Sequence, residues 1–163
     1  TYTPNWATKY SLAISLPTEA QWEFACRAGT TTGLNSGKEL TSASSHCSNL
    51  DEVAWYASHM APRPEGAVEG MHSEVGLLKP NAYGLYDMHG NVAEFTLDRR
   101  DITAERDNTE VFNPLVQDDT KNAVICGGQT KAGAALCASA ARDEHGATNG
   151  SRSAGFRLII TID

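Results

Sequence analysis

The chain has 163 residues, of which 40% are hydrophobic and 20% are charged, a composition typical of one globular domain around a single core. Its formal net charge of −7 argues against nucleic acid and anionic membranes as partners, because both attract basic surfaces. No apolar run approaches the roughly 18 residues that a membrane span needs, so we expect no membrane insertion.

The first residues, TYTPNWATKY, contain neither an initiator Met nor the apolar core of a signal peptide. This start indicates a processed or trimmed product with a portion missing upstream. The sequence is compatible with both a cytoplasmic and an extracytoplasmic location.

The clearest helix signal covers residues 16–30, LPTEAQWEFACRAGT. Thr18 with Gln21 matches a capping box, and Trp22 and Cys26 give one apolar face. Gly29 is placed to end the helix. A second short helix is predicted over residues 49–60, with Asn49 as its cap.

Residues 62–76 have the composition of an irregular loop, and the charged segment 96–110 that of a solvated connection. A strand is predicted at 123–129, where Gly127 and Gly128 suggest a bulge or a close backbone approach. Residues 155–163 are predicted to form a last, buried strand. The second half of the interval 130–154 is predicted to be an exposed loop. This inventory predicts a compact α+β domain with few helices, short strands and much irregular chain.

Three segments in this order resemble the formylglycine-generating-enzyme, or sulfatase-modifying-factor, family. They are LPTEAQWE in 16–30, PNAYGLYDMHGNVAEF at 80–95, and GGQ at 127–129 followed by GFRL at 155–158. The resemblance implies a variant of the C-type lectin fold, with residues 1–163 as one domain that lacks an N-terminal portion of the family. Departures from the family pattern include Ala93 and Phe95, which stand in place of two tryptophans.

The motif at residues 80–95 also makes sense as scaffold. Gly84 and Gly90 can supply positive φ, and Tyr83 and Tyr86 offer large faces for burial. A buried Arg157 needs a counterion, for which Glu19, Glu23 and Glu94 are candidates. The lone histidine of the turn, His89, is predicted to be an ordinary polar surface residue.

The resemblance implies a family whose catalytic members oxidise a sulfatase cysteine. They use a copper ion held by two thiolates. Copper(I) selects such a soft pair. Here Cys137 lies near the place of the second cysteine, whereas the first place falls at about Ala132. We therefore do not expect copper, and Cys137 would be catalytic only if the protein were an oxidase.

Calcium fits the resemblance better, because a bent loop with carboxylates supplies the hard oxygens that this ion prefers. The implied donors are the side chains of Asp87 and Glu94 with the carbonyls of Gly90 and Val92. A second implied site uses Asn49 and the Leu50 carbonyl, with Glu69 as the nearest further carboxylate. The alternative is that Asp87 and Glu94 cap turns or pair with arginines.

The four cysteines, Cys26, Cys47, Cys126 and Cys137, contain no CxxC pair, so a closed zinc site is not expected. Disulfides in an oxidising compartment and buried free thiols both remain open. The resemblance implies a Cys47–Cys137 disulfide as one arrangement, and Cys26 is expected to be free.

The leading functional hypothesis is a non-catalytic binding or assembly domain that contacts a small ligand or a protein through the interval 130–154. A specific version is the variable protein of a diversity-generating retroelement, whose diversified stretch corresponds to this interval. A subunit of a larger assembly and a fragment of a longer protein are further alternatives, and the competing hypothesis is the sulfatase-directed oxidase. The expected contact residues are Lys131, Asp143, Glu144, His145, Thr148, Asn149, Ser151 and Arg152.

Overall fold

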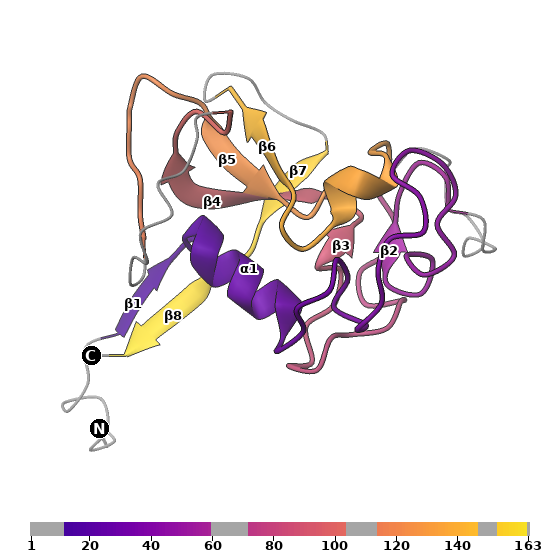
Figure 1. Cartoon of the computed structure of the whole chain (residues 1–163). Helices are drawn as coiled ribbons and strands as arrows, with labels where there is room; N and C mark the ends of the chain where they lie inside the picture. Colours follow the sequence, from indigo (N-terminus) through magenta and orange to yellow (C-terminus); the bar gives the residue numbers. More distant parts are fainter. Residues whose placement is uncertain (1–11, 60–71, 104–113, 147–152, 163) are drawn as a thin grey trace, which may run out of the picture.

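A single α-helix and three small sheets make up the part of the chain that the computed structural model describes, residues 12–59, 72–103, 114–146 and 153–162 (Figure 1). The expected α+β class is confirmed. In chain order the elements are β1 (Leu12–Ser15), α1 (Glu19–Arg27), β2 (Ala54–Trp55), β3 (His89–Gly90), β4 (Ala93–Arg99), β5 (Ala123–Cys126), the 3₁₀ helix η2 (Ala134–Cys137), β6 (Arg142–His145), β7 (Ala154–Phe156) and β8 (Ile159–Ile162).

The largest sheet has the strand order β6-β5-β4-β7. Strand β5 runs antiparallel to both β4 and β6, whereas β7 runs parallel to β4. Strands β1 and β8 form a separate antiparallel ribbon, and β2 and β3 form a short parallel pair. Figure 1 shows α1 below the large sheet, where it contacts β4 and β5.

Helix α1 begins as the sequence predicts. The Thr18 hydroxyl accepts a hydrogen bond from the Gln21 amide at 3.2 Å, and the Thr18 amide donates to the Gln21 side chain at 2.9 Å. The reciprocal pair is the predicted capping box. The helix ends at Arg27, because Ala28 and then Gly29 take left-handed conformations with φ values of 46° and 91°.

Two apolar clusters form the core. One joins Trp22 and Cys26 of α1 to Met88, Val124 and Cys126. Each large side chain buried in this way contributes roughly 1.5–3 kcal/mol. The other cluster gathers the irregular half of the domain and contains Leu34, Cys47, Leu50, Val53, Ala54, Tyr56, Ala132, Ala134 and Cys137.

The predicted helix over 49–60 is wrong. The Leu50 carbonyl accepts from the amides of Val53 and Ala54, which closes one turn, and the chain then enters β2. The turn does not continue into a helix because β2 pairs with β3. Next to β3, the Asn91 amide donates to the Trp55 carbonyl at 2.8 Å.

Three other segments differ from expectation. Residues 96–99 belong to β4 rather than to a solvated connection, and Thr96 and Asp98 are buried. Residues 142–145 form β6 in what was expected to be a loop. The predicted buried strand at 155–163 is divided between two sheets, and its apolar residues Phe156, Leu158 and Ile160 are exposed.

The predicted close approach at 127–128 is confirmed, because a Cβ on Gly128 would lie 2.6 Å from the Cys137 sulfur.

A buried ion-pair network fixes α1 against the sheet. Glu19, only 1% exposed, accepts from Arg100 Nε at 2.8 Å and from Arg142 Nε at 2.9 Å. The Glu19 amide in turn donates to Asp98 at 2.7 Å. Because Arg142 begins β6, this network also determines where β6 lies.

No helix in the described ranges is both long enough and apolar enough to cross a bilayer.

Candidate functional site

The side chain of Asn81 stabilises the turn at residues 81–88 and joins it to the end of α1. Its side-chain oxygen accepts from the amides of Tyr83 and Leu85, both at 3.0 Å, and its amide group donates to the carbonyls of Ala25 and Cys26. Because the chain curls around Asn81, the aromatic side chains of the turn point outward. The expected burial of Tyr83 and Tyr86 is wrong, since they are 52% and 43% exposed.

Arg157 forms an ion pair with a carboxylate, as the sequence predicts. Of the three candidates, the structure selects Glu94, which accepts from Arg157 Nε at 3.0 Å and from Arg157 Nη2 at 2.8 Å. Glu94 also accepts from the Trp22 indole at 2.6 Å. This arrangement links the last part of the chain to both β4 and α1.

The residues of the first expected calcium site lie partly together. Asp87, Val92 and Glu94 line one groove, whereas Gly90 lies in β3, where its amide donates to Gly127. Asp87 accepts from the Gly76 amide at 2.7 Å. The oxygens suit a hard cation, but those of Glu94 already accept from Arg157 and Trp22. A bound calcium ion would share them or displace Arg157.

The second expected calcium site has a weaker donor set. The Asn49 side chain donates to the Glu39 carbonyl at 3.0 Å, and the Leu50 carbonyl already accepts two backbone hydrogen bonds. Glu69 lies outside the described residues. Among the residues that are described, no three His, Cys, Asp or Glu side chains form a group that could hold a metal ion.

His89 is fully buried, which corrects its assignment to the surface. Its Nε2 accepts from the Asn35 amide at 3.0 Å, and its Nδ1 lies 2.6 Å from the Cys137 carbonyl, to which it donates as the neutral tautomer. Burial lowers the His89 pKa to about 4, so the ring is uncharged at neutral pH. His89 therefore acts as a structural bridge between residues 35 and 137.

All four cysteines are buried and free, so the Cys47–Cys137 disulfide is not formed in the structure. Burial raises the pKa of Cys137 to about 12, which keeps it a thiol rather than a thiolate. Ala132, at the place of the first catalytic cysteine, is buried in the same cluster. The same cluster contains one further buried free thiol, that of Cys47.

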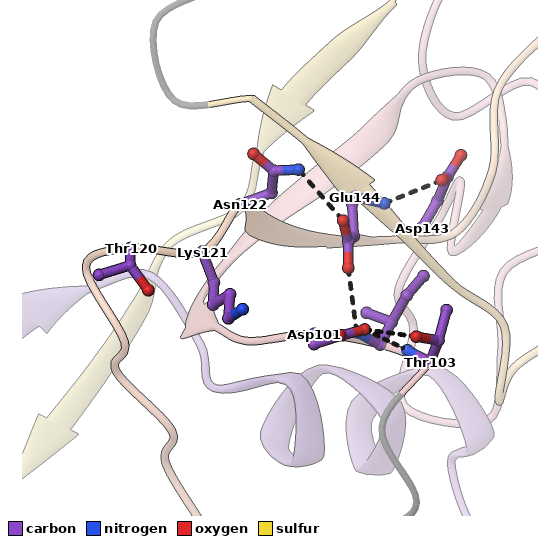
Figure 2. Close-up of a pocket in the computed structure, with 8 residues that line it drawn as sticks. Asp101, Thr103, Thr120, Lys121, Asn122, Asp143 and Glu144 are labelled. Carbon is purple, nitrogen blue, oxygen red and sulfur yellow. Dashed lines mark hydrogen bonds between the residues drawn. The ribbon is translucent and has the colours of Figure 1, made fainter.

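A polar cavity of about 370 Å³ lies at one edge of the large sheet, where β6 meets the connections that flank β4 and β5 (Figure 2). Glu144 projects into it and accepts from the Ile102 amide at 3.0 Å and from the Asn122 side chain at 3.1 Å. These hydrogen bonds lower the Glu144 pKa. The cavity is lined by Asp101, Ile102, Thr103, Thr120, Lys121, Asn122, Asp143 and Glu144.

Two of the expected contact residues, Asp143 and Glu144, are brought together in this cavity. His145 packs edge-on against Phe95, with ring centroids 5.4 Å apart. Lys131 is exposed but does not line the cavity. The remaining four, Thr148, Asn149, Ser151 and Arg152, lie outside the described residues.

Sequence reasoning missed the other wall of this cavity, which contains Asp101, Thr103 and Lys121. These residues belong to connections, and Asp101 accepts from the amide and hydroxyl of Thr103 at 2.9 and 2.6 Å. Their one available signal was the Asp-x-Thr spacing, which is typical of an Asx turn but does not indicate a site.

Comparisons with known proteins agree on one family. A model described as "Sulfatase-modifying factor enzyme 1-like domain" matches residues 2–162. The formylglycine-generating enzyme of Mus musculus is 32% identical over 146 residues, which cover 87% of this chain and 38% of that enzyme. The chain therefore spans well under half of this relative.

Solved structures give the same picture of the fold. Treponema denticola variable protein 1 superposes with a TM-score of 0.69 at 33% identity, covering 89% of this chain and 46% of that one. PvdO from Pseudomonas aeruginosa superposes with a TM-score of 0.61 at 24% identity, covering 89% and 51%, and shows the fold alone. Because the family model matches almost the whole chain, this protein belongs to the sulfatase-modifying-factor, or formylglycine-generating-enzyme-like, family.

Proposed function

We propose that this domain is a non-catalytic binding module that contacts a small ligand or a partner protein through β6 and the adjoining part of the segment 130–154. The observation that carries this proposal is the polar cavity, which Asp143 and Glu144 both line and into which Glu144 projects. The network that pairs Arg142 with Glu19 supports it, because a rigid strand start holds the next two residues in place.

The similarity to Treponema denticola variable protein 1 supports a narrower version, in which residues of the segment 130–154 differ between copies of the protein. Ser139 and Arg142 fit this version as invariant supports. Ser139 is buried and its hydroxyl donates to the Gly33 carbonyl at 3.1 Å, while Arg142 is held by Glu19. Asp143, by contrast, is exposed and free to differ.

Copper(I) titration separates the binding module from the oxidase that the mouse relative suggests. We expect the reduced protein to form no tight bis-thiolate complex, because Ala132 provides no sulfur and Cys137 is a buried thiol. The measurement is competition with a chromophoric copper(I) chelator, with Cys137→Ser as the matched variant. Stoichiometric copper that C137S abolishes would favour the oxidase instead.

The cavity is testable by amide shifts in nuclear magnetic resonance. A panel of small polar probes (amines, carboxylates and monosaccharides) is expected to move the signals of residues that line the cavity, above all those of residues 120–122 and 143–144. Asp143→Asn and Lys121→Ala should weaken these shifts by several-fold, whereas Lys131→Ala, an exposed lysine outside the cavity, should not. Shifts confined to residues around Cys137 would contradict the proposed location.

Calcium remains part of the proposal as a structural ion at Asp87, Glu94 and the neighbouring carbonyls. If it binds, calcium at about 100 times its dissociation constant adds about 2.7 kcal/mol, or roughly 5–10 °C in melting temperature. Protein stripped with EDTA and refilled should show this rise by differential scanning calorimetry. Asp87→Asn should abolish the rise, and Asp119→Asn, a fully exposed carboxylate, should leave it intact. An unchanged melting temperature would rule the ion out.

A further inference from the structure

A second hollow, of about 450 Å³, lies beside β7 and is largely apolar, unlike the cavity at β6. Val75, Tyr86 and Phe156 form its walls, and they are 75%, 43% and 66% exposed. Three large apolar side chains that converge on one groove while facing solvent are unusual for a surface with no partner. We refer to this hollow as the β7 groove.

The floor of the β7 groove is rigid and electrically neutral. Glu94 and Arg157 both line the groove and pair with each other through two hydrogen bonds. Because Trp22 holds the same carboxylate, the floor is anchored in the core. A binding partner would therefore meet a preformed surface, and little conformational entropy would be lost on the side of this protein.

The rim of the β7 groove carries negative charge. Within the described ranges Asp87 forms no ion pair with a cationic side chain, and its carboxylate accepts from the Gly76 amide at 2.7 Å. Glu74 is exposed next to Val75. With Arg157 already neutralised by Glu94, the groove favours a partner in which an apolar side chain is flanked by a basic one.

Strand β7 is also an edge of the large sheet. It pairs with β4 on one side, and no strand of the described residues lies on its other side. Open strand edges accept extended peptides by adding a strand, while side-chain pockets beside the edge provide selectivity. Phe156, the last residue of this edge strand, lines the β7 groove, so the groove lies beside the end of β7.

We infer that the β7 groove binds an extended segment of a partner protein, with a large apolar side chain between Tyr86 and Phe156 and a lysine or arginine next to it facing Asp87. A second copy of this chain fits poorly, because its own groove carries the same negative rim and the chain as a whole has a net charge of −7. The inference concerns a different surface from the β6 cavity and does not depend on it. It applies to the calcium-free protein, because a calcium ion at Asp87 and Glu94 would occupy the same groove.

An array of labelled nonapeptides tests the inference directly. Each peptide carries a central Leu, Phe or Trp next to Lys, Ala or Glu, and binding is measured by fluorescence anisotropy in EDTA so that calcium does not compete for Asp87. We expect the lysine-containing peptides to bind most tightly and the glutamate-containing peptides most weakly.

The test variant and its control both replace exposed residues, so neither substitution disturbs the core. Phe156→Ser should weaken binding at least tenfold, whereas Ile160→Ser, a similarly exposed residue on β8, should leave it unchanged. Asp87→Asn should remove most of the preference for Lys over Ala. The inference is overturned if no peptide binds above the all-alanine control, if F156S binds as well as the unmodified protein, or if sedimentation shows a dimer that F156S dissociates.

Discussion

Replacing Glu19 by glutamine is expected to lower the free energy of unfolding by about 3–5 kcal/mol. Glutamine keeps the shape of the side chain but removes the charge that compensates Arg100 and Arg142, whose side chains are only 12% and 11% exposed. Burial and the neighbouring guanidinium of Arg142 already lower the pKa of Arg100, which loses its Glu19 partner in the variant, whereas Arg142 keeps its ion pair with Glu23.

Glu52 provides a matched control for the Glu19 substitution. It too bridges two cations, Lys38 and Lys79, but all three side chains are at least one-third exposed. Glu52→Gln should cost no more than about 1 kcal/mol, because surface ion pairs are weak. Urea denaturation of both variants measures the difference. Equal losses would show that burial of the Glu19 network has no special weight.

Replacing Gly90 by alanine is expected to be about as damaging. Gly90 has a φ of 72°, which costs an L-residue about 1–2 kcal/mol. In addition, its new Cβ would lie 2.2 Å from the Trp55 carbonyl oxygen. That oxygen cannot move away freely because it accepts from the Asn91 amide. With an overpacking cost of about 1–3 kcal/mol, the expected loss is about 2–5 kcal/mol.

Gly84 separates the two causes. Its φ of 78° is similar, but no atom lies within 4 Å of the position of an added Cβ. Gly84→Ala should therefore show the conformational cost alone, about 1–2 kcal/mol. Chemical denaturation of the two variants side by side gives the cost of the close approach between β2 and β3. If G90A were no less stable than G84A, the close approach would be unimportant.

Local signals of the sequence predicted the local structure well. The start of α1 depends on Thr18 and Gln21, which are three residues apart, and it formed as expected. The pairing of Arg157 with Glu94 was also within reach, because the sequence offered only a few carboxylates for this arginine, whose side chain is 27% exposed. The family resemblance rested on such short segments and is confirmed by the model match.

Features that depend on distant contacts were not predictable in the same way. His89 looks like a turn residue, yet its two ring nitrogens contact residues 35 and 137, which no local pattern places together. Residues 49–60 have a helical pattern, but the pairing of β2 with β3 overrides it. Of the two walls of the β6 cavity, the sequence indicated Asp143 and Glu144 and missed the one formed by connections.

The ribbon of β1 and β8 has a consequence for the way the chain folds. It pairs Leu12 with Ile162, so its hydrogen bonds join segments from opposite ends of the described chain (Figure 1). Contacts of such high sequence separation form slowly, since the entropy of closing the loop must be lost first. During synthesis, β1 would leave the ribosome long before its partner exists. The ribbon is therefore expected to close last, after the helix and the large sheet have already joined.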